Sequence, residues 1–326
     1  MATNYPSTHP AVAITARRAP FSILEVSTEA PGPGEVLIHV KWTASSPADL
    51  HQVDGDLVDD FPFLLGCSFA GIVVGVGSED TNAVSPETKH LEVGDRVAGF
   101  IASQPKHAGF QAFVTVPSWA TGRIPANLSF QEAVTVPVNL VTAFTPLPSP
   151  LASIYHGLFP PTLLLKSMIK SFLSGERLAV SILSAAERVP YVLDCIGDVE
   201  GSLRPLTKIA QYGIRVAVVV PTIIRHASRQ AEPQLTRDTS TVLVGEWKEG
   251  VKIVPVMTFS YQENEFFKWH LQPEIIPELL KDAHIKPNKH RVVDGDTLLE
   301  RAQRALDLLR DRAPSGERLV WKVSES

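Results

Sequence analysis

The chain has few of the residues from which disulfide frameworks, metal loops and nucleic-acid surfaces are built. Only two cysteines occur in 326 residues, Cys67 and Cys195, which excludes a disulfide framework and a four-cysteine metal loop. The net charge is −5, and basic residues form nothing longer than pairs such as Arg17-Arg18, so nucleic-acid binding is not expected.

Long apolar runs and targeting signals are also missing. The stretch 216–224 is among the longest apolar runs, and it is interrupted by proline and much shorter than the roughly 20 residues of a membrane-spanning helix. Residues 1–11 lack the charged-then-apolar pattern of a secretory signal. We therefore expect a cytoplasmic protein that has no membrane partner.

What the sequence does contain is typical of a soluble globular protein. Hydrophobic residues make up 44% and charged residues 20% of the chain, and its length allows one large or two medium domains. Residues 35–42 and 109–117 alternate apolar and polar side chains, and the turn cluster 31–34 precedes the first of these runs. This pattern predicts a β-rich, barrel-like domain in the first 140 residues.

The later part of the chain has a different rhythm. Two short apolar runs at 191–197 and 214–221 flank the helix-like stretch 199–212, which predicts a strand–helix–strand unit in a parallel sheet. Capping boxes at 129–132 and 297–300 predict helix starts. An alternating final strand is expected at 318–323.

Six motifs, in this order, carry a resemblance to a known family. They are Ser46-Pro47-Ala48-Asp49, Gly66-Cys67-Ser68-Phe69-Ala70-Gly71, Val93-Gly94-Asp95-Arg96-Val97, Asn139-Leu140-Val141-Thr142-Ala143-Phe144, Asp194-Cys195-Ile196-Gly197 and Ser315-Gly316-Glu317-Arg318-Leu319-Val320. Together they resemble the zinc-independent branch of the medium-chain dehydrogenase/reductase superfamily, and in particular its fungal trans-acting enoyl reductases and quinone oxidoreductase-like proteins.

The resemblance implies an α/β protein with two parts. A GroES-like β-barrel catalytic domain is expected at 10–140, completed by 262–326. A truncated Rossmann-type parallel-sheet domain for nucleotide binding is expected at 141–261. The second part is called truncated because a Gly-rich strand-to-helix turn should follow Phe144 within one βαβ unit, and the sequence has none.

The region between 145 and 190 is where this departure lies. Five prolines crowd its first part, which disfavours regular helices and central strands. One helix at 163–172 and one short strand at 178–183 are all that its pattern predicts. Since a βαβ unit needs about 30 residues, two overlapping units cannot fit in this region.

A catalytic zinc ion is not expected. Zinc-dependent members of the superfamily have Cys-x-x-Asp and Gly-His-Glu where this chain has Ser46-Pro47-Ala48-Asp49 and Gly66-Cys67-Ser68. Three protein ligands are needed for a catalytic zinc ion, and the serines are poor ligands. Cys67 is therefore expected to be a small core residue. His51, His107 and His156 have no ligand-like spacing and are expected at the surface or behind site residues.

The resemblance implies NADPH as the cofactor and assigns seven residues to its binding. Ser46 and Asp49 would contact the nicotinamide ribose and carboxamide, and Thr142 the pyrophosphate or nicotinamide. The remaining four would line the cofactor crevice or lie where the last strand returns to the cofactor: Cys195, Ile196, Gly316 and Arg318.

Three of these residues also have plain structural interpretations. Asp49 is well placed to cap a helix, Thr142 to bond its own backbone, and Cys195 to pack in the core. Asp95, within Val-Gly-Asp-Arg-Val, is expected to be a turn residue that pairs locally.

The function implied is NADPH-dependent hydride transfer to the activated C=C bond of an enoyl thioester, an enone or a quinone. The partners implied are a small-molecule or acyl-thioester substrate and a polyketide synthase. Two alternatives stay open because the Gly-rich turn is missing. In the first, the chain is a catalytically silent remnant that acts as a binding module. In the second, residues 145–190 reflect a gene-model error in an ordinary reductase.

Overall fold

The structure is a computed structural model that describes residues 5–78, 91–101, 103–145 and 191–325. The chain divides into two compact units, Met1–Leu140 with Gln262–Ser326 and Val141–Tyr261. The helix predicted at 163–172 and the strand predicted at 178–183 lie outside the described residues. None of the helices in the described ranges has the length and apolar character needed to span a bilayer.

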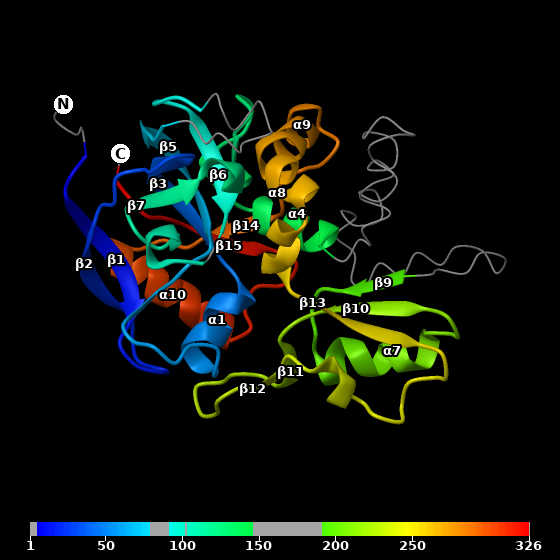
Figure 1. Cartoon of the computed structure of the whole chain (residues 1–326). Helices are drawn as coiled ribbons and strands as arrows, with labels where there is room; N and C mark the ends of the chain where they lie inside the picture. Colours follow the sequence, from blue (N-terminus) through cyan, green and yellow to red (C-terminus); the bar gives the residue numbers. More distant parts are fainter. Residues whose placement is uncertain (1–4, 79–90, 102, 146–190, 326) are drawn as a thin grey trace. The chain divides into compact units, whose positions relative to one another are not determined.

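The first unit is built on two sheets (Figure 1). The larger sheet has the order β14-β15-β3-β5-β6-β8, with β7 also paired to β3, and the smaller has the order β2-β1-β4. Their strands are β1 (Thr8–Ile14), β2 (Ser22–Ser27), β3 (Glu35–Ser45), β4 (Phe63–Leu64), β5 (Ser68–Val76), β6 (Arg96–Phe100), β7 (Phe113–Pro117), β8 (Thr121–Arg123), β14 (His290–Val292) and β15 (Arg318–Lys322).

Short helices complete the first unit. They are α1 (Pro47–Asp54), η1 (Pro105–His107), η2 (Ser118–Ala120), α3 (Phe130–Ala133), α8 (Glu265–His270), η6 (Leu271–Ile275), α9 (Ile276–Lys281) and α10 (Leu298–Arg310). Two more, α4 (Pro137–Phe144) and η5 (Thr258–Glu263), cross the boundary between the units along the chain.

The last strand is locked into the core of the first unit. Trp321 is fully buried, its ring lies edge-on to Phe110 with centroids 4.6 Å apart, and its indole N–H donates to Ser45 Oγ at 2.9 Å. β15 pairs antiparallel with β3, with Leu319 opposite Ser45. The C-terminal segment therefore belongs to the same sheet as residues 35–45.

A glycine in β5 is required by close approach of its neighbour strand. A Cβ atom on Gly71 would lie 2.1 Å from the His39 carbonyl oxygen of β3, an atom that cannot move without breaking the pairing. We expect Gly71→Ala to lower the free energy of unfolding by about 3 kcal/mol, measured by urea denaturation.

Gly75→Ala is the matched control in the same strand. Its Cβ would meet Leu37 at 3.4 Å, an ordinary contact, so we expect a loss below about 1 kcal/mol. Equal losses for the two variants would contradict the close-approach explanation.

The second unit contains a three-stranded parallel sheet of order β13-β10-β9 and a β11–β12 hairpin. Its elements are β9 (Tyr191–Asp194), η3 (Val199–Leu203), α7 (Arg204–Ile209), β10 (Arg215–Val219), β11 (Thr222–Arg225), β12 (Gln234–Thr236), η4 (Thr239–Thr241) and β13 (Lys252–Val256). Figure 1 shows α7 against one face of the sheet, where Leu203 and Leu206 pack on Val216 and Val218.

Several sequence predictions are confirmed and others need correction. The strand–helix–strand rhythm is present, and Ser129 begins α3 with a complete capping box. Thr297 is the N-cap of α10 as predicted, but the Glu300 carboxylate accepts from the Asp296 N–H, so the second box is only half formed. The strand predicted at 109–117 begins only at Phe113. His51 and His107 are buried, which rules out the surface alternative for both and leaves the alternative that they lie behind site residues as a prediction; His156 lies outside the described residues.

Candidate functional site

Ser46 and Asp49 form the start of α1. Ser46 is the N-cap and Pro47 the first helical residue. The Asp49 carboxylate accepts hydrogen bonds from the Ser46 backbone N–H at 2.6 Å and from Ser46 Oγ at 3.2 Å. The capping interpretation of Asp49 is therefore confirmed. A carboxylate at this position also interacts favourably with the helix dipole.

Arg318 lies beside this helix start. Because Leu319 is opposite Ser45 in the β15–β3 pair, Arg318 continues the register opposite Ser46. Its Nη1 donates to Asn139 Oδ1 at 2.9 Å. Its Nε and Nη2 are buried and find no hydrogen-bond partner among the described residues. These two donors form the edge of the guanidinium that binds carboxylates and phosphates in a bidentate manner.

An unused donor pair of this kind is unfavourable in the interior. A buried donor without a partner costs about 1–3 kcal/mol, and more when it is charged. The Nε–Nη2 edge of Arg318 therefore calls for an acceptor that the described side chains do not provide.

Burial and the Arg318 charge together set the electrostatics of this cluster. Burial raises the pKa of Asp49 to about 6, although the Ser46 hydrogen bonds and Arg318 work in the opposite direction. Burial, together with the Asp49 carboxylate, raises the pKa of the Cys67 thiol to about 12. Cys67 is 5% exposed, which confirms it as a core residue.

The raised pKa of Asp49 predicts a pH effect on stability. The folded state retains a proton that the unfolded chain releases above a pKa of about 3.8, so stability falls as pH rises from about 4 to 6. Asp49→Asn keeps an oxygen for the Ser46 N–H and cannot ionise. We therefore expect its free energy of unfolding, relative to the wild type, to rise by up to about 3 kcal/mol across that window. The check is urea denaturation at half-unit pH steps, and a constant difference would contradict it.

In the second unit, two of the predicted residues lie at the carboxyl end of a parallel strand, and a third, in helix α4, contacts a residue at the carboxyl end of another. Thr142 Oγ1 is 3.1 Å from Thr258 Oγ1, which follows β13. Cys195 and Ile196 follow β9, and both are exposed, Ile196 by 57%. Ligands of open α/β sheets bind at this edge. The core interpretation of Cys195 is therefore wrong.

Gly316 has a backbone explanation. Its φ is +64°, in the left-handed region, and a Cβ there would meet no atom within 4 Å. It forms the turn that leads into β15, and its glycine identity follows from the backbone conformation.

The helix start after β9 is already occupied. The Asp198 carboxylate caps η3 by accepting from the backbone N–H groups of Glu200 and Gly201, both at 2.9 Å. A phosphate needs such amides free, and the negative charge of Asp198 opposes it. This helix end therefore does not replace the missing Gly-rich turn.

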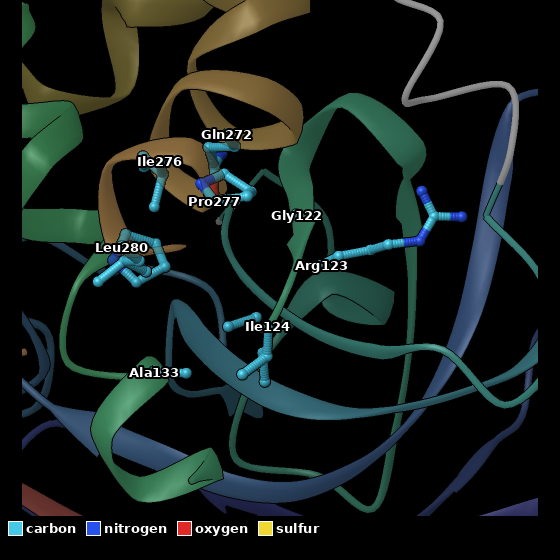
Figure 2. Close-up of a pocket in the computed structure, with 10 residues that line it drawn as sticks. Gly122, Arg123, Ile124, Ala133, Gln272, Ile276, Pro277 and Leu280 are labelled. Carbon is cyan, nitrogen blue, oxygen red and sulfur yellow. The ribbon is translucent and has the colours of Figure 1, made fainter. Parts of the chain in front are cut away.

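Metal-ligating clusters and cavities add little to the site. No group of three metal-ligating side chains occurs among the described residues. A pocket in the first unit, lined by Gln272, Ile276 and Leu280 among others, offers about 10 Å³, room for about one water molecule (Figure 2). Figure 2 shows the Arg123 side chain pointing away from it. Small-molecule sites typically exceed about 300 Å³, and none of the seven predicted site residues lines this pocket.

Some predicted residues thus come together and others do not. Ser46, Asp49 and Arg318 form one cluster in the first unit, while Thr142, Cys195 and Ile196 share one sheet edge in the second. Sequence reasoning missed two partners, Asn139 and Thr258. Asn139 belongs to one of the six motifs, but its hydrogen bond with Arg318 joins residues 179 positions apart and is visible only in the folded structure. Asp95 accepts from the Glu92 N–H within its turn, as expected, and also forms an ion pair with Arg123, 28 residues further along the chain.

Comparisons of the sequence with known proteins match part of the chain. Residues 32–148 match the alcohol dehydrogenase GroES-like domain. The trans-enoyl reductase tazE of Aspergillus terreus is 33% identical over 144 residues, covering 42% of this chain and 46% of that protein. The trans-enoyl reductase tndF of Aspergillus flavipes is 34% identical over 144 residues, covering 42% and 40%. The chain therefore spans less than half the length of these curated relatives.

Solved structures extend the likeness to the full chain. A crystal structure of an NAD-dependent alcohol dehydrogenase has a TM-score of 0.66 at 18% identity, covering 97% of this chain and 100% of that one. Such low identity supports the fold alone. The predicted α/β fold class is confirmed by it. The chain has the fold of the medium-chain dehydrogenase/reductase superfamily, with an alcohol dehydrogenase GroES-like domain, and resembles fungal trans-enoyl reductases in sequence.

Proposed function

We propose that the protein is an NADPH-dependent oxidoreductase of the enoyl-reductase type. The observation that carries this proposal is the buried Arg318 guanidinium, whose Nε–Nη2 edge lacks an acceptor beside Asp49 among the residues that the structure describes. It lies in a chain whose relatives are named trans-enoyl reductases. The first unit would be the catalytic domain and the second the nucleotide-binding domain.

The residues of the two units have separate tasks in this proposal. Arg318, kept in place by Asn139, supplies a bidentate donor edge for an anionic or carbonyl group, and Ser46 and Asp49 shape the helix start next to it. Thr142, Cys195 and Ile196 offer a mixed hydroxyl and apolar lip at the sheet edge. When bound, NADPH would supply the hydride for an activated C=C bond.

The substrate proposed is an enoyl thioester, an enone or a quinone. An acyl-thioester substrate would make a polyketide synthase the natural protein partner. Zinc is not part of the proposed chemistry, because Ser46 and Ser68 stand at two of the ligand positions of zinc-dependent members.

A silent binding module is the second candidate. The specific observation in its favour is that Asp198 occupies the helix N-terminus after β9, and the sequence has no Gly-rich turn to bind the pyrophosphate. Without those charge-assisted bonds, NADPH affinity would fall by several powers of ten.

Titration of the purified protein with NADPH separates the two candidates. Saturable fluorescence change and thermal shift in the micromolar range would support the reductase, and enoyl-thioester turnover would be assayed next. A folded protein that shows no binding would support the silent module. A protein without a cooperative melting transition would point to a faulty gene model at 145–190, which a transcript across that region would test.

A further inference from the structure

The turn that follows β9 is held by an unusually dense set of hydrogen bonds. Asp194 Oδ1 accepts from the backbone N–H groups of Ile196 at 2.9 Å and Gly197 at 3.3 Å. Asp194 Oδ2 accepts from Ser202 Oγ at 2.7 Å. Asp194 is 4% exposed, so these three donors take the place of water at its carboxylate oxygens. The carboxylate thereby fixes the turn from the inside.

Ser202 connects this carboxylate to a second one. Its hydroxyl is fully buried, donates to Asp194 Oδ2 and accepts from the Asp198 backbone N–H at 3.1 Å. The Asp198 side chain caps η3 through Oδ1 and pairs with His226 Nε2 through Oδ2. Hydrogen bonds therefore run from His226, just after β11, to the amides of the turn.

The backbone of the turn is also fixed from the hairpin side. The Ile223 N–H of β11 donates to the Gly197 carbonyl at 2.6 Å, and Ile223 bridges to Asp198. Gly197 has φ +64°, and a Cβ there would lie 2.8 Å from the Val219 carbonyl oxygen. With Asp194 and Gly197 both turned inward, Cys195 and Ile196 are the turn residues left exposed.

A simple turn needs far fewer contacts. A two-residue Asx turn is closed by one side-chain acceptor, whereas here two carboxylates, a hydroxyl and an imidazole converge. The buried parts of the network stabilise one conformation of two exposed residues, which is what a ligand-facing turn requires.

We propose that Ser202, Asp198 and His226 are positioning residues that hold Cys195 and Ile196 in the conformation that faces the ligand. The conformational part of this proposal stands on the second unit alone, while its effect on NADPH affinity rests on the proposed function. The three residues act through the turn and do not touch the ligand themselves.

Cys195 is a built-in probe of this turn. The chain has only one other cysteine, Cys67, which is buried. Although Cys195 is an exposed residue, desolvation of its thiol, with the neighbouring Asp194 carboxylate, raises the pKa of the thiol to about 12, so the thiolate is scarce at pH 8. A looser turn hydrates the thiol, lowers its pKa and speeds its reaction with a maleimide.

The experiment measures the maleimide labelling rate of Cys195 at pH 8, with Cys67 distinguished by peptide mass spectrometry. We expect Ser202→Ala to raise the rate by about tenfold. Thr207→Val is the matched control, because among the described residues the Thr207 hydroxyl bonds just the Arg204 carbonyl within its own helix, α7, and this variant should label at the wild-type rate.

His226 gives a second pair of variants that do not disturb the core. Its side chain is 34% exposed, so His226→Ala should fold and label faster by a few-fold. His226→Gln keeps an N–H donor for Asp198 and should restore the wild-type rate. A general loss of stability would not be rescued in this way.

The NADPH dissociation constant is then measured for the same variants. Faster labelling with a several-fold weaker Kd supports the whole proposal. Faster labelling in a protein whose wild type binds no NADPH would refute the proposed function and leave the positioning role supported. Wild-type labelling rates in both Ser202→Ala and His226→Ala would overturn the positioning role, whatever the cofactor result.

Discussion

Replacing Arg310 by methionine is expected to lower the free energy of unfolding by about 3–5 kcal/mol. Arg310 forms a bidentate ion pair with Asp54, Nε to Oδ2 at 2.9 Å and Nη2 to Oδ1 at 2.6 Å. Asp54 is fully buried at the end of α1, and Arg310 is the last residue of α10. Methionine leaves the Asp54 carboxylate without its cation in a site that water does not reach.

A double variant separates the lost contact from the stranded charge. Asp54→Asn in the Arg310→Met background removes the charge, and we expect it to recover at least about 1 kcal/mol of the loss. Arg304→Ala is the control on the same helix, because its pair with Glu300 is solvent-exposed and contributes no more than about 0.5 kcal/mol. Urea denaturation followed by tryptophan fluorescence measures all four proteins. A loss no larger than that of Arg304→Ala would show that the pair does not stabilise the fold.

Elements near the beginning and near the end of the chain could be predicted, because the sequence patterns that specify them are local. Alternation of apolar residues predicts β3, and Thr297 with Glu300 predicts the start of α10, and both elements are present. The motif around Gly316 and Arg318 likewise predicts the last strand. What local patterns could not specify is pairing, since β15 joins β3 across about 270 residues of chain, and its register decides what Arg318 faces.

The candidate site was predictable only in part, for a related reason. The family resemblance assigned Ser46, Asp49 and Arg318 to cofactor binding, but the partners of these residues depend on tertiary contacts. Arg310 pairs with the buried Asp54 and with the more exposed Asp307. Nothing in the sequence distinguishes these two carboxylates. The network of Asp194, Ser202 and His226 was equally hidden, because it depends on the hairpin β11–β12 returning to the turn after β9.

Removing the guanidinium of Arg318 is expected to have the largest effect on ligand binding. If its Nε–Nη2 edge binds an anionic or carbonyl group of NADPH, Arg318→Met should weaken NADPH binding by about 10- to 100-fold, since two charge-assisted hydrogen bonds are lost. Arg318→Lys keeps a point charge without the bidentate edge, so it should recover less than half of the lost binding free energy. Fluorescence titration gives all three dissociation constants.

Arg318 also lowers the pKa of the buried Asp49 carboxyl, and this second role must be separated from binding. In the Asp49→Asn background there is no charge at residue 49 for Arg318 to balance. A ligand-binding Arg318 should therefore show the same loss of NADPH affinity when replaced in that background as in the wild type. If Asp49→Asn/Arg318→Met binds as tightly as Asp49→Asn, Arg318 serves only to balance Asp49, and its free donor edge is satisfied by water. An equal loss of NADPH affinity in both backgrounds would instead make β15 a ligand-binding element as well as a strand of the larger sheet of the first unit.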